Sequence, residues 1–333
     1  MCGENEREAL AKRLKGQKLV IPNMQPIFAN WPGGQNENYP EIKAVFDKEF
    51  RTWWPTATKR RYRVLTDFII WFCVWDDAIE QLGTSDQNHN RGAAERLRAE
   101  TKAFVKEVLL SPAATAATAA AVAGNKGANH VTAPNPLLIS LGSIGEELRT
   151  NLDEEQRGAL AGYFDKYIDA TQLEAEADQG TDIPSLEKYW EVRKLSSGMP
   201  LLLGLSEYAH QIKLPIRPVN STQYRELWDT AIVINSIVND LISFKKEMKA
   251  GSLLSSVAIL YHQLDDLDAA VQISLDHLKE LVSEFDRTAE AVLRSVPAGS
   301  SEFYAVSKDI DSMRTVNTGN LNWSPSAMGS RKG

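Results

Sequence analysis

A helical stripe of polar side chains constrains the fold of this chain more than any other feature. The stripe occupies every fourth position of the otherwise apolar segment AIVINSIVNDLISF and the residues just after it: Asn235, Asn239, Ser243 and Glu247. Side chains four residues apart share one face of a helix. Burying such a stripe without partners would cost several kcal/mol. A bound ion is a natural partner, because hard oxygen ligands suit magnesium and Lys246 suits a phosphorylated substrate.

An acidic motif lies far upstream, at the end of an aromatic run. The run FIIWFCVW leads directly into Asp76, Asp77 and, three residues later, Glu80. Asp76 and Glu80 share a helix face that continues backward through Phe72 and Cys73. Carboxylates at the rim of an aromatic wall suit a charged head group that carries an oily tail.

The two motifs differ in specificity. With 44 acidic residues in 333, a DDxxE pattern is expected about 0.8 times by chance, so the alternative interpretation of this motif is the solvated end of a buried helix. The pattern N-D-x-x-S-x-x-K-E is expected only about 0.001 times by chance and carries more of the argument. Asn239 and Glu247 are about 12 Å apart along an ideal helix, so one ion meets both only if the side chains lean together.

Helical periodicity elsewhere predicts an all-α protein with almost no sheet. The segment 196–200, SSGMP, predicts a break within a longer helix. The tail NTGNLNWSPSAMGSRKG, residues 317–333, is expected to be irregular. The helices are expected at residues 4–16, 41–50, 58–83, 137–151, 155–178, 185–195, 221–250, 253–293 and 299–313.

The length and the absence of a clear linker predict a single α-helical domain over residues 1–333. We expect an N-terminal strap at 1–40, a low-complexity insertion between helices at 111–136, and a C-terminal tail at 314–333 that closes the site.

Bulk composition excludes several classes of protein. A net charge of −7 argues against nucleic-acid binding and against docking on anionic lipid. Two separated cysteines, Cys2 and Cys73, predict no disulfide framework, and scattered histidines predict no zinc site. No apolar stretch reaches about 18 residues and the N-terminus is charged, so we expect a cytoplasmic protein without stable membrane insertion.

Together the motifs resemble those of the class I terpene synthases, specifically the fungal single-domain sesquiterpene synthase type. The sequence from Asp76 to Glu80 is similar to the family's aspartate-rich motif, and Asn239 to Glu247 to its downstream metal triad. Arg193 precedes Asn239 by 46 residues, as the family's diphosphate-sensing arginine does. Residues 319–324, GNLNWS, resemble a fungal segment near the C-terminus. The resemblance spans about residues 60 to 324.

The resemblance implies an α-helical bundle with its active site at the open end, and three Mg²⁺ ions. Asp76 would bind two ions and the downstream triad the third. The implied metal residues are Asp76, Asp77, Glu80, Asn239, Ser243 and Glu247. The implied diphosphate-binding residues are Arg193, Lys246 and Arg331, the first two being catalytic with Asp76. The implied helix-break sensor is Ser196, Ser197 and Gly198. The implied pocket residues are Phe72, Cys73, Asn235 and Trp323.

One departure concerns the C-terminus, where the family usually has an Arg-Tyr pair. This chain has Arg331 followed by Lys332, and Arg314 is the alternative contact. The implied activity is magnesium-dependent cyclisation of a prenyl diphosphate, farnesyl diphosphate first, to a sesquiterpene, by a monomer or homodimer. The alternatives are a diterpene cyclase acting on geranylgeranyl diphosphate, a chain-elongating prenyltransferase and a non-enzymatic helical lipid-binding protein.

Overall fold

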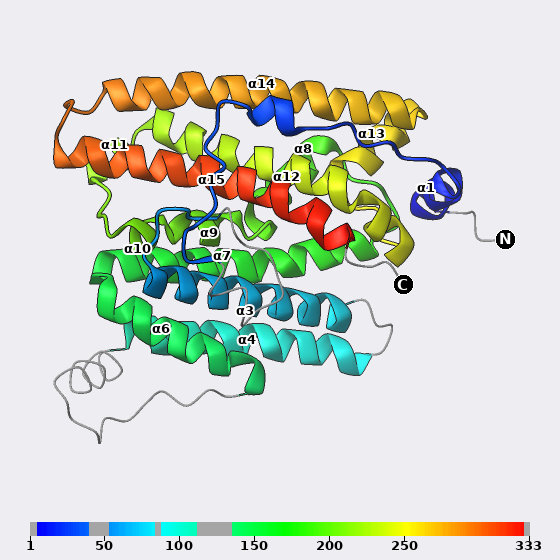
Figure 1. Ribbon diagram of the computed structural model, residues 1–333. Helices are drawn as coiled ribbons and strands as arrows, with labels where there is room; N and C mark the ends of the chain where they lie inside the picture. Colours follow the sequence, from blue (N-terminus) through cyan, green and yellow to red (C-terminus); the bar gives the residue numbers. More distant parts are fainter. Residues whose placement is uncertain (1–4, 40–52, 84–87, 112–134, 330–333) are drawn as a thin grey trace. The chain divides into compact units, whose positions relative to one another are not determined.

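The computed structural model of the protein describes residues 5–39, 53–83, 88–111 and 135–329 (Figure 1), with no side chains described beyond Asn322. All regular elements in these ranges are helices, which confirms the all-α prediction. The helix expected at 41–50, most of the 111–136 insertion, and Arg331 lie outside the described residues.

The chain divides into two compact units, which are considered separately below. One consists of Met1–Pro55, Glu176–Met199 and Leu214–Gly333, and the other of Thr56–Ala175 and Pro200–Lys213. We call the first the stripe unit, because it holds Asn239, and the second the acidic unit, because it holds Asp76. Each unit is made of separated pieces of chain. This division does not decide whether residues 1–333 form one domain, so the single domain stays a prediction.

The acidic unit is built around the aromatic helix. Its elements are α3 (Lys59–Gly83), α4 (Asn88–Leu110), η2 (Pro136–Leu138), α6 (Ile139–Asn151), most of α7 (Glu154–Gln179), part of α9 (Met199–Gly204) and α10 (Ser206–His210). The rings of Phe68, Trp75 and Phe164 are almost completely buried. The indole of Trp75 also donates to Thr101 Oγ1 of α4 at 2.9 Å, which satisfies its only polar atom.

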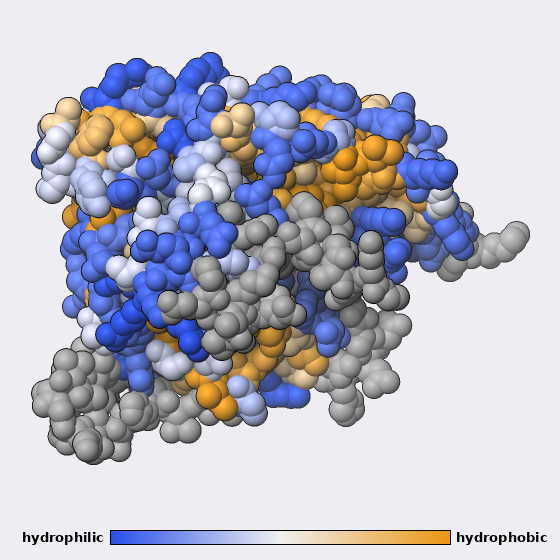
Figure 2. Space-filling model, in the orientation of Figure 1, coloured by the Kyte–Doolittle hydropathy of each residue, from blue (hydrophilic) through white to orange (hydrophobic). Residues whose placement is uncertain are grey.

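The stripe unit is organised by three long helices that lie side by side (Figure 1): α12 (Thr222–Ala250), α14 (Leu267–Arg294) and α15 (Ser301–Gly329). Its other elements are α1 (Glu6–Leu14), η1 (Gln25–Phe28), α8 (Leu186–Ser196), α11 (Ile216–Val219) and α13 (Ser256–Leu264). Helix α12 contacts α8, α13, α14 and α15, so it lies in the core. The outward face of α14 is hydrophilic (Figure 2), as expected of an amphipathic covering helix.

The single helix expected over 253–293 is wrong, because two helices meet at a sharp turn. Asp265 has a left-handed backbone with φ of 54°, and its amide donates to Tyr261 O at 2.8 Å to close α13. The neighbouring Asp266 then caps α14 by accepting from the Ala269 amide at 3.0 Å. Aspartate tolerates the left-handed region and favours helix N-termini, so the Asp-Asp pair ends one helix and starts the next.

The irregular tail expected over 317–333 is also wrong, because α15 continues to Gly329, well beyond the end expected at residue 313. Val316 and Leu321 are buried, so the apolar face extends beyond the expected end. Thr318 Oγ1 donates to the Pro32 carbonyl at 2.8 Å. A Cβ on Gly319 would lie 1.6 Å from Cδ1 of Trp53, so this glycine allows an indole to lie directly against the helix.

Gly319→Ala is therefore expected to destabilise the protein by about 1–3 kcal/mol, because the rigid indole would have to move. A matched control is Gly162→Ala on α7, where an added Cβ meets nothing within 4 Å. There the helix propensity of alanine should stabilise by about 0.5–1 kcal/mol. Urea unfolding midpoints measure both effects, and equal midpoints for the two variants would contradict this account.

Candidate functional site

The polar stripe of α12 leaves the core as it approaches the end of the helix. Residues 231–238 are all buried, including Asn235, whereas Asn239, Ser243 and Glu247 are each partly exposed. Lys246 is exposed beside them. The three oxygen-bearing side chains thus follow the buried segment 231–238 and lie on the accessible part of the helix.

The amide of Asn239 faces a cation in this structure. Arg193 lies in the last turn of α8, and its Nη2 donates to Asn239 Oδ1 at 2.6 Å. The same nitrogen lies 3.4 Å from Asp240 Oδ1, and the Arg193 side chain is only 16% exposed. The 46-residue separation in sequence therefore corresponds to a direct contact in the fold.

The donor atoms of the stripe fit a magnesium ion. Ser243 Oγ donates its proton to the Asn239 carbonyl at 2.7 Å, which leaves the lone pairs of the hydroxyl available to a cation. An amide, a hydroxyl and one carboxylate are hard oxygen ligands, as magnesium prefers. Within the described residues no group of three or more His, Cys, Asp or Glu side chains could hold a metal. An ion at the stripe would therefore combine the single carboxylate of Glu247 with neutral oxygens and with oxygens from a phosphorylated ligand.

The helix break predicted at SSGMP is confirmed. Helix α8 ends at Ser196, α9 begins at Met199, and Gly198 between them has a φ of 71°. Ser197 Oγ accepts from the Met199 amide at 3.3 Å. The buried hydroxyl of Ser196 has no hydrogen-bond partner among the described residues, which is costly unless another group reaches it.

Asp240 is a structural centre that the sequence analysis missed. It is 1% exposed, and both carboxylate oxygens accept from Tyr189 Oη, at 2.8 and 2.7 Å. One of these oxygens also accepts from the amide and the hydroxyl of Ser256, at 2.8 and 2.6 Å. Asp240 thus joins α8, α12 and α13. The only sequence signal is an aspartate on the apolar side of the stripe, one position after Asn239.

The acidic motif lies in the other unit and has a different environment. Asp76 is partly buried, whereas Asp77 and Glu80 are exposed. Tyr167 of α7 donates a short hydrogen bond to Asp76 Oδ1. Complete burial, and then the nearby charge of Asp76, raises the pKa of Tyr167 well above its usual value, so the phenol stays a donor. The sequence analysis gave Tyr167 no role.

The aromatic wall before the acidic motif is a ring cluster. The Phe72 ring lies 5.0 Å from that of Tyr167 and 6.3 Å from that of Phe68. Phe72 and Cys73 are both partly exposed, unlike the fully packed Phe68. The wall therefore presents aromatic and thiol surface on the same helix that carries the carboxylates.

The C-terminal candidates are only partly described. Trp323 lies within α15, but its side chain lies outside the described part, as does the whole of Arg331. The Arg314 guanidinium pairs with Asp286 at 2.9 Å and with Asp311 at 3.3 Å. Two carboxylates already balance that charge, which weakens Arg314 as an alternative diphosphate contact.

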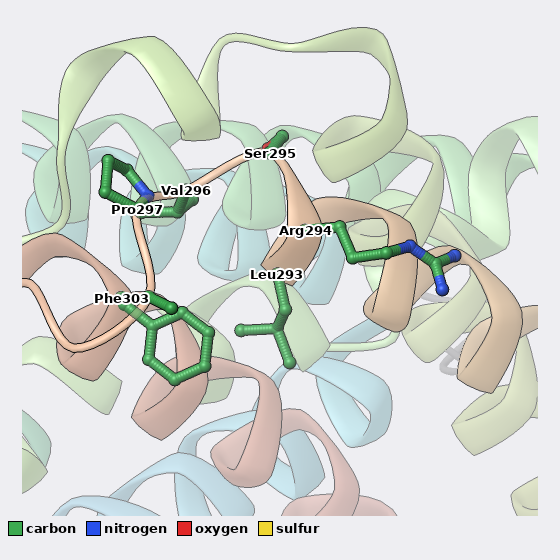
Figure 3. A pocket seen from close by; sticks show the side chains of 7 residues that line it. Leu293, Arg294, Ser295, Val296, Pro297 and Phe303 are labelled. Carbon is green, nitrogen blue, oxygen red and sulfur yellow. The ribbon is translucent and has the colours of Figure 1, made fainter.

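A hollow elsewhere on the stripe unit contains none of the predicted site residues. It lies at the turn from α14 to α15, and Figure 3 shows the side chains of Leu293 and Phe303 side by side with Arg294 directed away. This turn is at the opposite end of α14 from α13. Its lining residues are Leu293, Arg294, Ser295, Val296, Pro297, Ala298 and Phe303.

Comparison with known proteins connects both motifs to one family. A family model described as terpene synthase family 2, C-terminal metal binding, matches residues 67–284, which include every predicted metal ligand. Sesquiterpene cyclase hepA of Aspergillus oryzae is 26% identical over 318 residues, covering 88% of this chain and 83% of that protein. Pristinol synthase of Streptomyces pristinaespiralis is 26% identical over 280 residues, covering 81% and 68%.

Solved structures show the same fold. An α-eudesmol synthase superposes with a TM-score of 0.70 at 14% identity, covering 94% of this chain and 100% of that one. A linalool/nerolidol synthase from Streptomyces clavuligerus, in complex with 2-fluorogeranyl diphosphate, gives 0.68 at 15% identity, covering 93% and 99%. The expected family resemblance and helical fold are confirmed. No helix among the described residues is both long and apolar enough to cross a membrane.

Asp240→Ala is expected to destabilise the protein by about 3 kcal/mol or more, because buried donors on Tyr189 and Ser256 lose their acceptor. The matched control is Asp229→Ala on the same helix, whose exposed carboxylate lies 3.4 Å from Lys194. That change should cost at most about 1 kcal/mol. Urea unfolding separates the two, and similar midpoints would contradict the central role of Asp240.

Tyr167→Phe is expected to change how stability depends on alkaline pH. The raised pKa of Tyr167 gives a stabilising contribution that is complete below about pH 10 and is lost as the pH rises through the raised value. The variant should therefore lose stability less steeply than the native protein above about pH 10. Melting temperatures recorded across this range test the difference, and parallel curves for the two proteins would exclude it.

Proposed function

Because this chain belongs to terpene synthase family 2, we propose that it ionises a linear prenyl diphosphate, farnesyl diphosphate first, and cyclises the resulting carbocation to a sesquiterpene. The observation that carries the proposal is the contact between Arg193 and Asn239 at 2.6 Å. This contact places a guanidinium beside the exposed part of the polar stripe. A diphosphate would need the guanidinium, and its magnesium ions would need the oxygens of the stripe.

The diphosphate group of the substrate would be bound by charged and oxygen-bearing side chains. Arg193 and Lys246 would bind phosphate oxygens through charge-assisted hydrogen bonds. Bound magnesium, three ions by resemblance, supplies neutralisation of the negative charge that develops on the leaving group. The residues that would hold magnesium on the stripe unit are Asn239, Ser243 and Glu247. On the acidic unit they are Asp76 with its supporting neighbours Asp77 and Glu80.

The guanidinium of Arg193 has a further role in this proposal. In the structure it donates to Asn239 Oδ1 and approaches Asp240 Oδ1. A diphosphate would compete for the same nitrogen, and moving that nitrogen would release the amide oxygen toward a cation. Substrate binding and completion of the metal site would thus favour each other. The adjoining break at Ser196, Ser197 and Gly198 would allow the end of α8 to follow the arginine.

The hydrocarbon end needs apolar and aromatic surface. When the C–O bond breaks, its electron pair leaves with the diphosphate and an allylic cation remains. Aromatic faces such as Phe72 stabilise nearby positive charge by about 0.5–2 kcal/mol each. We assign Phe72, Cys73, Asn235 and Trp323 to the pocket wall. The diphosphate or water accepts the final proton, so no separate strong base is required.

The alternative enzymes differ from the proposal in the number of carbon atoms in the substrate or in the sequence of the downstream metal motif. The relative from Aspergillus oryzae is named a sesquiterpene cyclase, which favours a fifteen-carbon substrate over geranylgeranyl diphosphate. A chain-elongating prenyltransferase is disfavoured because the second motif contains Asn239, Ser243 and Glu247 instead of a second aspartate-rich sequence.

Incubation with magnesium and each prenyl diphosphate, followed by analysis of a hexane extract, tests the proposal. A cyclic fifteen-carbon product supports it, a cyclic twenty-carbon product supports the diterpene alternative, and a longer diphosphate supports elongation. Unchanged substrate in every incubation would exclude all three activities.

Asn239→Ala and Asp76→Ala are each expected to lower turnover by about 10²–10³-fold, because each removes an oxygen from the proposed metal sites. Asp229→Ala, on the exposed side of the same α12 helix, should keep turnover within about twofold, as an isolated surface change does. Turnover near the native level in both site variants would remove the proposed metal ligands.

A further inference from the structure

Helix α1 buries a charged side chain against other elements of the stripe unit. Leu10 and Leu14 on this helix are completely buried, as an apolar face requires. Arg7 on the same helix has a side chain that is only 10% exposed. A buried guanidinium is costly unless it is paired and hydrogen-bonded, so the partners of Arg7 identify what α1 holds in place.

Those partners lie in the last turn of α7 and in the segment between α7 and α8. Arg7 Nη2 pairs with Asp178 Oδ1 at 2.5 Å, and Nη1 donates to the Ala177 carbonyl at 2.6 Å. The Arg7 amide donates to Thr181 O at 3.4 Å. Side chain and backbone together fix α1 to the end of α7 and to the segment that leads into α8.

Asp178 extends this contact to the end of α12. Its Oδ1 also accepts from Ser252 Oγ at 3.2 Å. The Ser252 amide donates to the Glu247 carbonyl at 3.1 Å, in the turn that ends α12 at Gly251. A continuous set of bonds therefore runs from Arg7 through Asp178 and Ser252 to the backbone of Glu247.

We propose that Arg7 is a positioning residue for Glu247, and that α1 is a clasp on the metal-binding end of α12. The inference rests on the proposed function of the stripe. The last turn of a helix frays readily, since its carbonyls have no partners within the helix. The Glu247 carbonyl accepts from the amides of both Gly251 and Ser252. Holding Ser252 through Asp178 supports this turn, and the direction of the Glu247 carboxylate then depends on a turn that α1 fixes.

The other end of α1 supplies a matched control. Arg13 pairs with Asp265 at 2.8 Å, but these side chains are 37% and 67% exposed. Arg13 also lies 3.2 Å from His262 Nδ1 of α13. Arg13→Ala therefore removes an ion pair from the same helix without touching the bonds that lead to Glu247.

The first measurement needs no ligand. In the metal-free protein, Arg7→Ala should accelerate hydrogen exchange at the amides of residues 250–252 by about tenfold, because the turn loses its support. Arg13→Ala should leave these rates within about twofold of native. Unchanged exchange in Arg7→Ala, or equal acceleration in both variants, would overturn the clasp.

The second measurement is a calorimetric titration of the protein with magnesium in the presence of inorganic diphosphate. Mutating a residue that directly supports a metal ligand typically lowers metal affinity by about 10–100-fold. Arg7 acts on Glu247 only through Asp178 and Ser252. For Arg7→Ala we therefore expect a smaller effect, a rise of about 3–10-fold in the magnesium concentration at half-saturation. Turnover at saturating magnesium should stay within about twofold of native. Native half-saturation in Arg7→Ala would contradict the proposal.

The two proposals fail in different ways. If the native protein converts no prenyl diphosphate, the proposed function fails. Hydrogen exchange and the magnesium titration with inorganic diphosphate still test whether α1 acts as a clasp. If the native protein is active and Arg7→Ala keeps its magnesium requirement, the clasp alone fails. Should Arg7→Ala not fold, Ser252→Ala interrupts the same bonds nearer to Glu247 and must give the same shift.

Discussion

The buried carboxylate of Asp240 is the interaction on which the stripe unit depends. It accepts from Tyr189 on α8 and from Ser256 at the start of α13, while it belongs to α12 itself. A carboxylate with four short donor contacts is stable away from water, whereas one that lost them would not be. By fixing α8 against α12, Asp240 sets the register in which Arg193 meets Asn239.

This arrangement explains why two adjacent residues have such different surroundings. Asn239 is partly exposed and its amide oxygen faces a guanidinium, whereas Asp240 points into the core and holds helices together. One position of rotation on a helix, about 100°, separates the two environments. The N-D pair therefore combines a group suited to ligand binding with a group that fixes its direction.

Much of the helical architecture could be predicted from the sequence, because long periodic segments dominate it. The stripe of α12, the aromatic α3 and the break at Gly198 follow from patterns within one segment. The turn at Asp265 was missed because only two residues, a left-handed Asp265 and an extended Asp266, interrupt an otherwise helical segment. The continuation of α15 was missed because Gly319 looks like a helix breaker until Trp53 is seen against it.

The site contacts that were missed share a different cause. Tyr167 with Asp76 and Tyr189 with Asp240 are pairs between residues 91 and 51 positions apart. Nothing in either local pattern distinguishes such a tyrosine from an ordinary core aromatic residue. Arg193 was found only because a family spacing was available. Periodicity locates elements, but it does not specify which distant side chains will meet.

The anchoring of α1 also bears on the order in which the chain can fold during synthesis. Arg7 and Arg13 precede Asp178 and Asp265 by 171 and 252 residues. At about 5–20 residues per second, ribosomal synthesis takes about 10–50 s to cover the longer interval. During that time the apolar face of α1, with Leu10 and Leu14, has no docking surface and is accessible to chaperones. The segment of α1 is thus made before its binding partners and can complete the stripe unit only after they emerge.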